Sequence, residues 1–198
     1  MYGFQGARIG SVIPVLAALV LACAGEPRPP AAAPDSAPAP AGPPPPPAAP
    51  SAEANGGWTQ GPVDGGGNAA GVAILTDVRT AAHDGYDRIV FEFTGGLPGY
   101  RVVWLDGPAV QCGSGEPVQV PGEATVEIAF EPAAAHDDDG RPTLEERARR
   151  PGLDSLVSLE LICDFEAHVD WVAGASRRTE VRVAALASPP RLVVDLRH

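Results

Sequence analysis

The sequence predicts an all-β domain, an antiparallel β-sandwich or open barrel of seven to nine strands, in its C-terminal two thirds. Apolar and polar side chains alternate in four segments, as in strands with one buried face: 87–93, 123–130, 179–185 and 191–197. Three more segments are apolar and rich in β-branched residues: 72–79, 100–106 and 156–163. Glycine and proline pairs between these segments predict turns. Many short strands of this kind are typical of sandwiches and barrels.

Composition limits the function classes. The chain has 198 residues, with 25 acidic and 14 basic side chains, and its formal net charge is −11. An acidic chain without a basic stripe argues against nucleic acid as a partner and against electrostatic docking on anionic lipid. The strand-rich part, residues 71–198, is long enough for one sizeable core but not for two. We expect it to be one monomeric domain.

Residues 1–22 have the features of an export signal. After Arg8, residues 9–22 are almost all apolar. A helix of that length reaches about 21 Å, short of the ~30 Å hydrocarbon core, so the segment indicates a signal peptide rather than a membrane span. Residues 20–23, Val-Leu-Ala-Cys, resemble a bacterial lipobox. This resemblance implies a lipid on Cys23 and a place on the extracytoplasmic face of the cell membrane; an ordinary signal peptide with an incidental cysteine is the alternative.

Residues 23–70 are rich in proline, alanine and glycine, with five consecutive prolines at 43–47. Proline fixes φ and lacks an amide donor, so this composition disfavours both sheet and helix interiors. We predict a disordered tether between the anchor and the domain. A proline-motif ligand for a partner domain is the alternative.

One long segment of the domain, residues 131–152, breaks the strand pattern. Thr143 and Glu146 have the spacing of a helix capping box, and arginines follow before Pro151 and Gly152. The pattern predicts one or two turns of exposed helix in a long loop.

The remaining two cysteines predict a disulfide. If Cys23 carries lipid, Cys112 and Cys163 are left as an even pair in an oxidising compartment. Cys163 shares an alternating face with Leu159 and Leu161, so we expect it to point inward. Two buried free thiols are the alternative.

No constellation in the sequence predicts catalysis, a metal or a cofactor. Ser114 lies between two glycines but lacks the spacing of a nucleophile elbow. The acidic tract 137–139 lacks the register of a calcium loop. His168 and Asp170 lack the spacing of metal ligands. We therefore expect a protein that is not an enzyme.

Several motifs together resemble a known family: His83-Asp84-Gly85-Tyr86-Asp87-Arg88, Pro98-Gly99-Tyr100, Gly113-Ser114-Gly115, Asp164-Phe165-Glu166, Trp171, Gly174 and Pro189-Pro190-Arg191 through Asp195. The stretch 71–198 resembles the AMIN-like domain of exported proteins and lipoproteins of high-GC Gram-positive bacteria. The family often has Phe-Glu-Gly where this chain has Ala167 after Glu166. The family takes its name from the AMIN domain, a β-sandwich that localises envelope proteins and is linked to peptidoglycan binding.

The resemblance implies an envelope lipoprotein with a non-catalytic binding module, and a wall polymer such as peptidoglycan is the leading ligand. A protein-protein interaction module that docks on a membrane-bound envelope partner is the alternative. The candidate ligand-binding residues are Arg88 and Arg191, whose guanidinium groups suit a carboxylate or phosphate, and Tyr86 as an apolar platform. Cross-strand ion pairs with the nearby Asp87 and Asp195 are the alternative role of these arginines.

Overall fold

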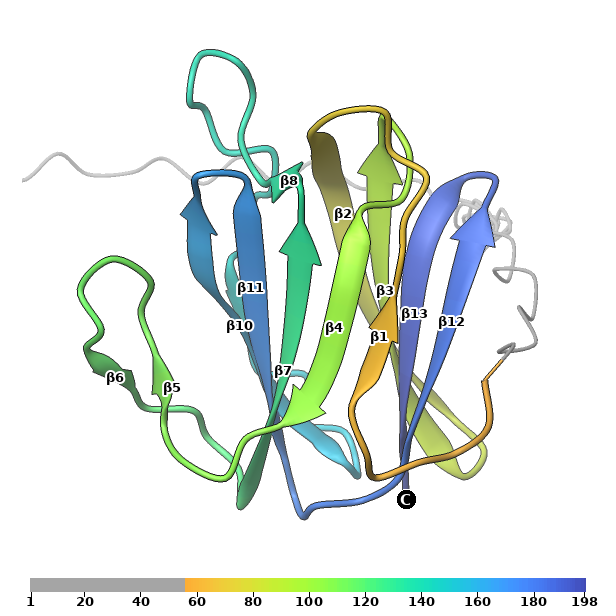
Figure 1. Ribbon diagram of the computed structural model, residues 1–198. Coiled ribbons are helices and arrows are strands. Elements are labelled where there is room, and N and C mark those ends of the chain that lie inside the picture. The colour runs from red at the N-terminus through yellow and green to blue at the C-terminus, as the bar shows by residue number, and fades with distance from the viewer. Residues whose placement is uncertain (1–55) are drawn as a thin grey trace, which may run out of the picture. The chain divides into compact units, whose positions relative to one another are not determined.

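The computed structural model describes residues 56–198, which form strands and loops only (Figure 1). The first sheet contains, in spatial order, β1 (Val63–Gly65), β4 (Gly99–Trp104), β7 (Ala124–Glu131), β11 (His168–Ala175), β10 (Leu156–Phe165) and β9 (Ala148–Arg149). The second contains β12 (Val181–Ala187), β13 (Pro190–Arg197), β3 (Tyr86–Thr94), β2 (Ala73–His83) and β8 (Ala133–Ala134). A separate hairpin contains β5 (Ala109–Val110) and β6 (Pro117–Val118). The predicted all-β fold is confirmed.

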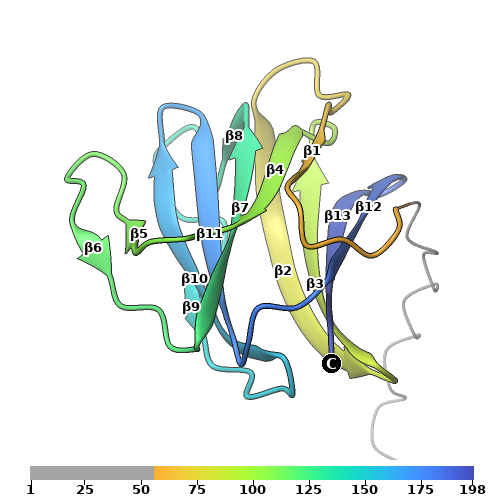
Figure 2. The same cartoon turned by 60° about the horizontal axis from the view of Figure 1, so that its bottom comes forward.

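Both large sheets are antiparallel, apart from the short parallel pair of β2 and β8. The final strand, β13, inserts between β12 and β3, so the closing segment of the chain pairs with the strand that contains Arg88. The chain passes from the six-stranded to the five-stranded sheet where β7 leads directly into β8. Figure 2 shows the same two sheets from a second direction.

The core lies between the inner faces of the two sheets. The alternation in the sequence places every second side chain there, because successive residues of a strand point to opposite faces. Aromatic side chains join the sheets: the ring of Phe91 lies 5.0 Å from that of Phe130 and 5.8 Å from that of Trp171, in edge-to-face geometry. All three side chains are buried. Such pairs add to the stabilisation that burial itself provides.

The prediction of a short helix in the loop after β7 is wrong. Residues 132–152 form turns, bends and the short strands β8 and β9, without a helical turn. The Thr143 hydroxyl donates to the carbonyl of Leu75 in β2 instead of capping a helix. Arg149 donates to the carbonyl of Val78. Contacts with a neighbouring strand therefore replace the local hydrogen bonds of a helix.

The folded part begins earlier than the sequence indicated. We assigned residues 56–70 to the tether, but they are part of the folded domain. Within them, β1 pairs with β4, and Thr59 forms a β-bridge with Val181 at the edge of β12. The Trp58 ring packs against Arg182. The export signal, Cys23 and the proline-rich stretch lie outside the described residues. Among residues 56–198, no helix has the length and apolar character needed to cross a membrane.

Candidate functional site

Two surfaces of the domain concentrate charged side chains, and the first contains the predicted residues Arg88 and Tyr86. Arg88 points to the outer face of the five-stranded sheet, where its Nε and Nη2 donate to the two carboxylate oxygens of Asp195 at 2.7 and 3.0 Å. Asp195 is fully buried. The hydrogen bonds that Arg88 donates to Asp195 raise the pKa of Arg88. Both arms of this guanidinium are therefore already engaged inside the domain.

A second arginine shares the same carboxylate. Arg182 in β12 donates through Nη2 and Nε to Asp195 at 2.7 and 3.1 Å. Its guanidinium lies 4.6 Å from the ring centre of Trp58 and 5.0 Å from that of Tyr86. We call Trp58, Tyr86, Arg88, Arg182 and Asp195 the arginine–aromatic cluster. Its internal pairing indicates that it holds the closing strand β13 between its two neighbours.

The other predicted residue, Arg191, lies apart from this cluster. It stands opposite Glu92 in the pairing of β13 with β3, four positions along from Asp195, which is about 13 Å in an extended strand. Arg191 is buried, and within residues 56–198 no carboxylate forms an ion pair with it, since Glu92 pairs with Arg79. The structure thus does not bring Arg88 and Arg191 to one point. Ligand binding by either arginine stays a prediction.

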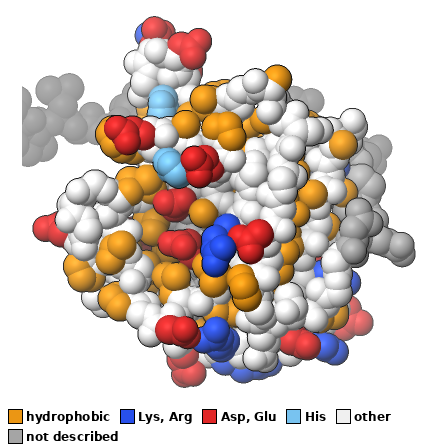
Figure 3. Space-filling view, viewed as in Figure 1, with side chains coloured by type: hydrophobic (Ala, Val, Ile, Leu, Met, Phe, Trp, Pro, Cys, Tyr) orange, Lys and Arg blue, Asp and Glu red, His pale blue; other side chains and the backbone are white. Residues whose placement is uncertain are grey.

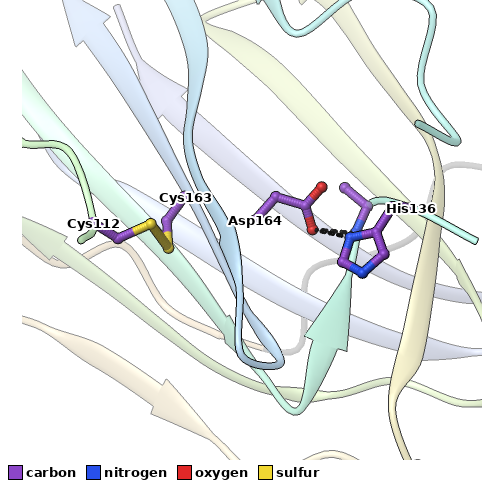
Figure 4. The surroundings of a disulfide bond; sticks show 5 residues. Cys112, His136, Cys163 and Asp164 are labelled. Atoms are coloured by element: carbon purple, nitrogen blue, oxygen red, sulfur yellow. Dashed lines mark hydrogen bonds and ion pairs between the residues drawn. A yellow bond between two sulfur atoms is a disulfide. The ribbon is translucent and has the colours of Figure 1, made fainter. Parts of the chain in front are cut away.

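The second surface lies on the outer face of the six-stranded sheet, beside the disulfide. Cys112 and Cys163 are bonded, with a Cα–Cα distance of 5.3 Å, which confirms the predicted pair. Cys163 does not point into the main core as we expected. A bulge between Leu161 and Cys163 reverses the alternation of β10. Asp164, the next residue, points the opposite way, toward His136 (Figure 4).

The disulfide attaches a flap, residues 105–123, which contains the β5–β6 hairpin. Ala109 in the flap packs with Ile162 and Val172 in a small apolar cluster separate from the main core. At the other end of the flap, the carbonyl of Pro121 accepts a hydrogen bond from the Ser158 hydroxyl at 2.7 Å. The flap is therefore fixed to β10 and β11 by a covalent bond, apolar contacts and a hydrogen bond.

Beside the flap lies an acidic groove, lined by Val103, Glu127 and Asp170 and, on the flap side, by Leu105; Val172 lies beneath it and is fully buried. Glu127 pairs across strands with both Val103 and Val172, and Asp170 lies two residues from Val172 along β11, opposite Ala129. Figure 3 shows acidic and hydrophobic side chains gathered in a hollow between the lobe at the left and the centre of the molecule. The groove therefore combines an apolar floor with two carboxylates.

The two carboxylates are half-buried and unpaired. Within the described residues neither Glu127 nor Asp170 takes part in a side-chain hydrogen bond or an ion pair; the nearby Arg101 donates to Asp64 at 2.8 Å. Burial raises the pKa of Glu127, and the charge of Asp170 adds to this effect, while Arg101 opposes it. Burial likewise raises the pKa of Asp170. Their negative charges are thus costly in the folded domain and suit a cation from outside.

Sequence reasoning missed this groove. The alternation of residues 123–130 places Glu127 on the outward face, and His168-x-Asp170 drew attention only as a weak metal motif. Neither pattern shows that a flap will lie beside these side chains. The pair of cysteines is the signal that could have indicated the site. Cys163 lies opposite Asp170 in the pairing of β10 with β11, and the disulfide brings residues near Cys112 to the same face of the sheet.

One other acidic centre, Asp164, has a structural role. Asp164 accepts hydrogen bonds from the amide of Ala135 and from Arg147, both at 2.9 Å, and pairs with His136 at 2.8 Å. Its contacts fix the start of the loop after β8. Across residues 56–198, no group of three or more histidine, cysteine, aspartate and glutamate side chains is arranged to hold a metal ion.

These features define a class: a disulfide-bonded antiparallel sandwich with an edge flap and an acidic outer groove. A family model for the AMIN-like domain matches residues 73–198. The chain belongs to the AMIN-like family, whose domains are associated with the cell envelope and suggest an envelope binding module. The resemblance noted from the motifs is therefore confirmed for the domain. No curated protein and no solved structure matches the chain.

Proposed function

We propose that this chain is an exported lipoprotein whose β-sandwich is a non-catalytic module that binds a cell-wall polymer such as peptidoglycan. The observation that carries the proposal is the acidic groove, where Glu127 and Asp170 lie half-buried on an apolar floor without an internal partner. Membership of an envelope-associated family supports the location. Binding sites commonly combine an apolar lining with a few well-placed polar groups.

Co-sedimentation with purified sacculi tests the binding role. The full chain, kept soluble in a non-ionic detergent, should pellet with sacculi and stay in the supernatant without them. A variant with Glu127→Gln and Asp170→Asn should pellet less. The matched control carries Asp84→Asn and Glu145→Gln, which remove the same charge from exposed positions and should leave pelleting unchanged. A wild-type chain that stays in the supernatant would argue against the polymer as ligand.

A docking module for an envelope protein is the second candidate, because two large apolar side chains are exposed beside the disulfide. Phe165 is 58% exposed and Val110 is 47% exposed, and each lies two residues from a bonded cysteine. Cross-linking of intact cells distinguishes the candidates. A Phe165→Ser variant that loses a protein cross-link but keeps sacculus binding would favour docking on a protein.

The proposed anchor rests on Cys23 and the apolar run before it. Cells that express the chain should incorporate labelled palmitate into the wild type and none into Cys23→Ala. Equal labelling of the two chains would reject lipidation at this residue.

A further inference from the structure

The outer face of β12 and β13, at the edge of the five-stranded sheet (Figure 1), is buried. Ala184 and Val193 lie opposite each other on that face, and each is only 2% exposed. Neither belongs to a hydrophobic core cluster of the described residues. The described strands that pack closely against β12 and β13 are their neighbours in the same sheet. This apolar face is therefore shielded from solvent, and its occupant remains to be assigned.

Arg191 brings an unpaired positive charge to the same face. It stands opposite Leu186 and is 9% exposed, and its Nε is buried without a hydrogen-bond partner. Its other cross-strand neighbour, Glu92, is engaged by Arg79 at 2.8 Å. A buried guanidinium without a counter-charge is strongly unfavourable. We therefore expect the occupant of this face to supply a carboxylate or another anion.

We infer that the occupant is the chain segment directly before residue 56, and that the carboxylate of Glu53 is the counter-charge of Arg191. The described part of the chain begins beside this face: a Cβ on Gly56 would lie only 2.9 Å from the carbonyl oxygen of Val183 in β12. Such a close approach favours glycine, which has no Cβ. The inference goes beyond the proposed function, because it holds whichever ligand the domain binds.

The direction of the chain and the distances both permit this pair. Thr59 bridges Val181 in antiparallel orientation, so the chain traced back from Thr59 runs along β12 toward Leu186. From Val183 to Leu186 the strand advances about 10 Å, and three extended residues before Gly56 cover about the same distance. Neighbouring strands are about 4.8 Å apart, a gap that an arginine side chain can cross.

Glu53 is the acid best placed for this role. Residues 1–55 contain three acids, Glu26, Asp35 and Glu53, and the first two lie much earlier in the chain. Residues 46–55 are otherwise proline, alanine, serine and asparagine, whose small side chains suit a shallow apolar face. Docking of this segment would move the point where the tether leaves the domain toward the turn between β12 and β13. The orientation of the domain on its tether would then be fixed.

Thermal melts of four full-length chains in detergent test the ion pair: the wild type, Glu53→Gln, Arg191→Met and the double variant. Glu53→Gln should lower the Tm by at least about 5 °C, because it leaves a buried guanidinium without its counter-charge. The same change should have little effect when Arg191→Met has already removed the guanidinium. The matched control, Asp35→Asn, should leave the Tm unchanged. An unchanged Tm for Glu53→Gln, or an equal loss in both backgrounds, would overturn the inference.

Hydrogen exchange followed by mass spectrometry tests the place of the segment. In the wild type, the amides of residues 51–55 should exchange at least about tenfold more slowly than those of residues 35–37, because docking shields them from solvent. Arg191→Met should remove most of this difference. Equally fast exchange of the two stretches in the wild type would refute docking.

Two other results would assign the face to a different occupant and reject Glu53. A second copy of the chain is indicated if Glu53→Gln leaves the Tm unchanged while the Tm rises with protein concentration in the wild type but not in Arg191→Met. An anion from outside the chain is indicated if inorganic phosphate raises the Tm of the wild type and of Glu53→Gln equally, but not that of Arg191→Met.

Discussion

At the scale of single residues, the fully buried Asp195 organises one outer face of the domain. It accepts hydrogen bonds from Arg88 on one side and Arg182 on the other. The carboxylate thus connects three neighbouring strands through side chains as well as through the backbone. A buried ion pair adds little net stability when complete, but the loss of one member leaves an uncompensated charge.

This asymmetry gives the first prediction. Asp195→Asn should lower the free energy of unfolding by about 3 kcal/mol, because two arginines lose their common counter-charge in a buried position. Urea denaturation followed by tryptophan fluorescence measures the change. Asp84→Asn, at an exposed turn, is the control and should change stability little. A midpoint for Asp195→Asn equal to that of the wild type would show that the arginines find water or other partners.

The sequence indicates which of these side chains face outward, but not which of them meet. Arg88 and Asp195 both occupy outward positions of alternating segments, and a pair of Arg88 with its neighbour Asp87 or of Arg191 with Asp195 was the simplest expectation. The observed pair depends on the insertion of the last strand next to β3, which brings residue 195 opposite residue 88. Strand order is a long-range property, and local periodicity does not contain it.

At the scale of elements, the flap and the loop after β7 show where local signals fail. The capping-box spacing around Thr143 is real, but the hydroxyl and the following arginines contact β2 and β10 instead. A short helix is marginal in water, so a few tertiary hydrogen bonds outweigh its capping. The bulge that turns Cys163 outward is similarly invisible in the alternation of its strand. The two cysteines nevertheless predicted the bond, because compartment and even number suffice for that inference.

The flap's attachment gives the second prediction. A variant with both Cys112→Ser and Cys163→Ser should unfold with a free energy lower by up to about 4 kcal/mol, the chain-entropy value for a closed loop of this length. Amide exchange should accelerate in residues 109–118 more than in β3. Calorimetry and hydrogen exchange by mass spectrometry measure the two effects. Unchanged exchange in the flap would show that its apolar contacts with Ile162 and Val172 hold it without the disulfide.

At the scale of the whole molecule, the two outer faces carry opposite chemistry. The outer face of the five-stranded sheet uses its acidic group internally, and its arginines are stacked on aromatic rings. The outer face of the six-stranded sheet leaves carboxylates unpaired beside apolar side chains. The net charge of the chain predicts poor attraction to anionic partners, and the unpaired carboxylates of this face act in the same direction.

The unpaired carboxylates give the last prediction, which concerns pH. Burial raises the pKa values of Glu127 and Asp170 above their ordinary values of 4.5 and 3.8. Arg101 on β4 opposes the shift for Glu127, while Glu131 and His168 act on Asp170 in opposite directions. The folded domain therefore holds these protons more tightly than the unfolded chain does. The stability that the two protonated carboxyl groups contribute is complete when the pH is below their ordinary pKa values. It is lost as the pH rises through their raised pKa values in the folded domain.

Above their raised pKa values both groups are charged, and the folded domain bears the cost of their burial. Glu127→Gln/Asp170→Asn should consequently raise Tm at neutral pH, and the difference from the wild type should narrow as the pH falls toward about 4. Thermal melts from acid to neutral pH measure it, with Asp84→Asn/Glu145→Gln as the equal-charge control that should show no such trend. A groove variant that melts below the wild type at neutral pH would contradict the raised pKa values. A gain in stability at the expense of ligand binding, in contrast, is the behaviour of residues retained for recognition rather than for folding.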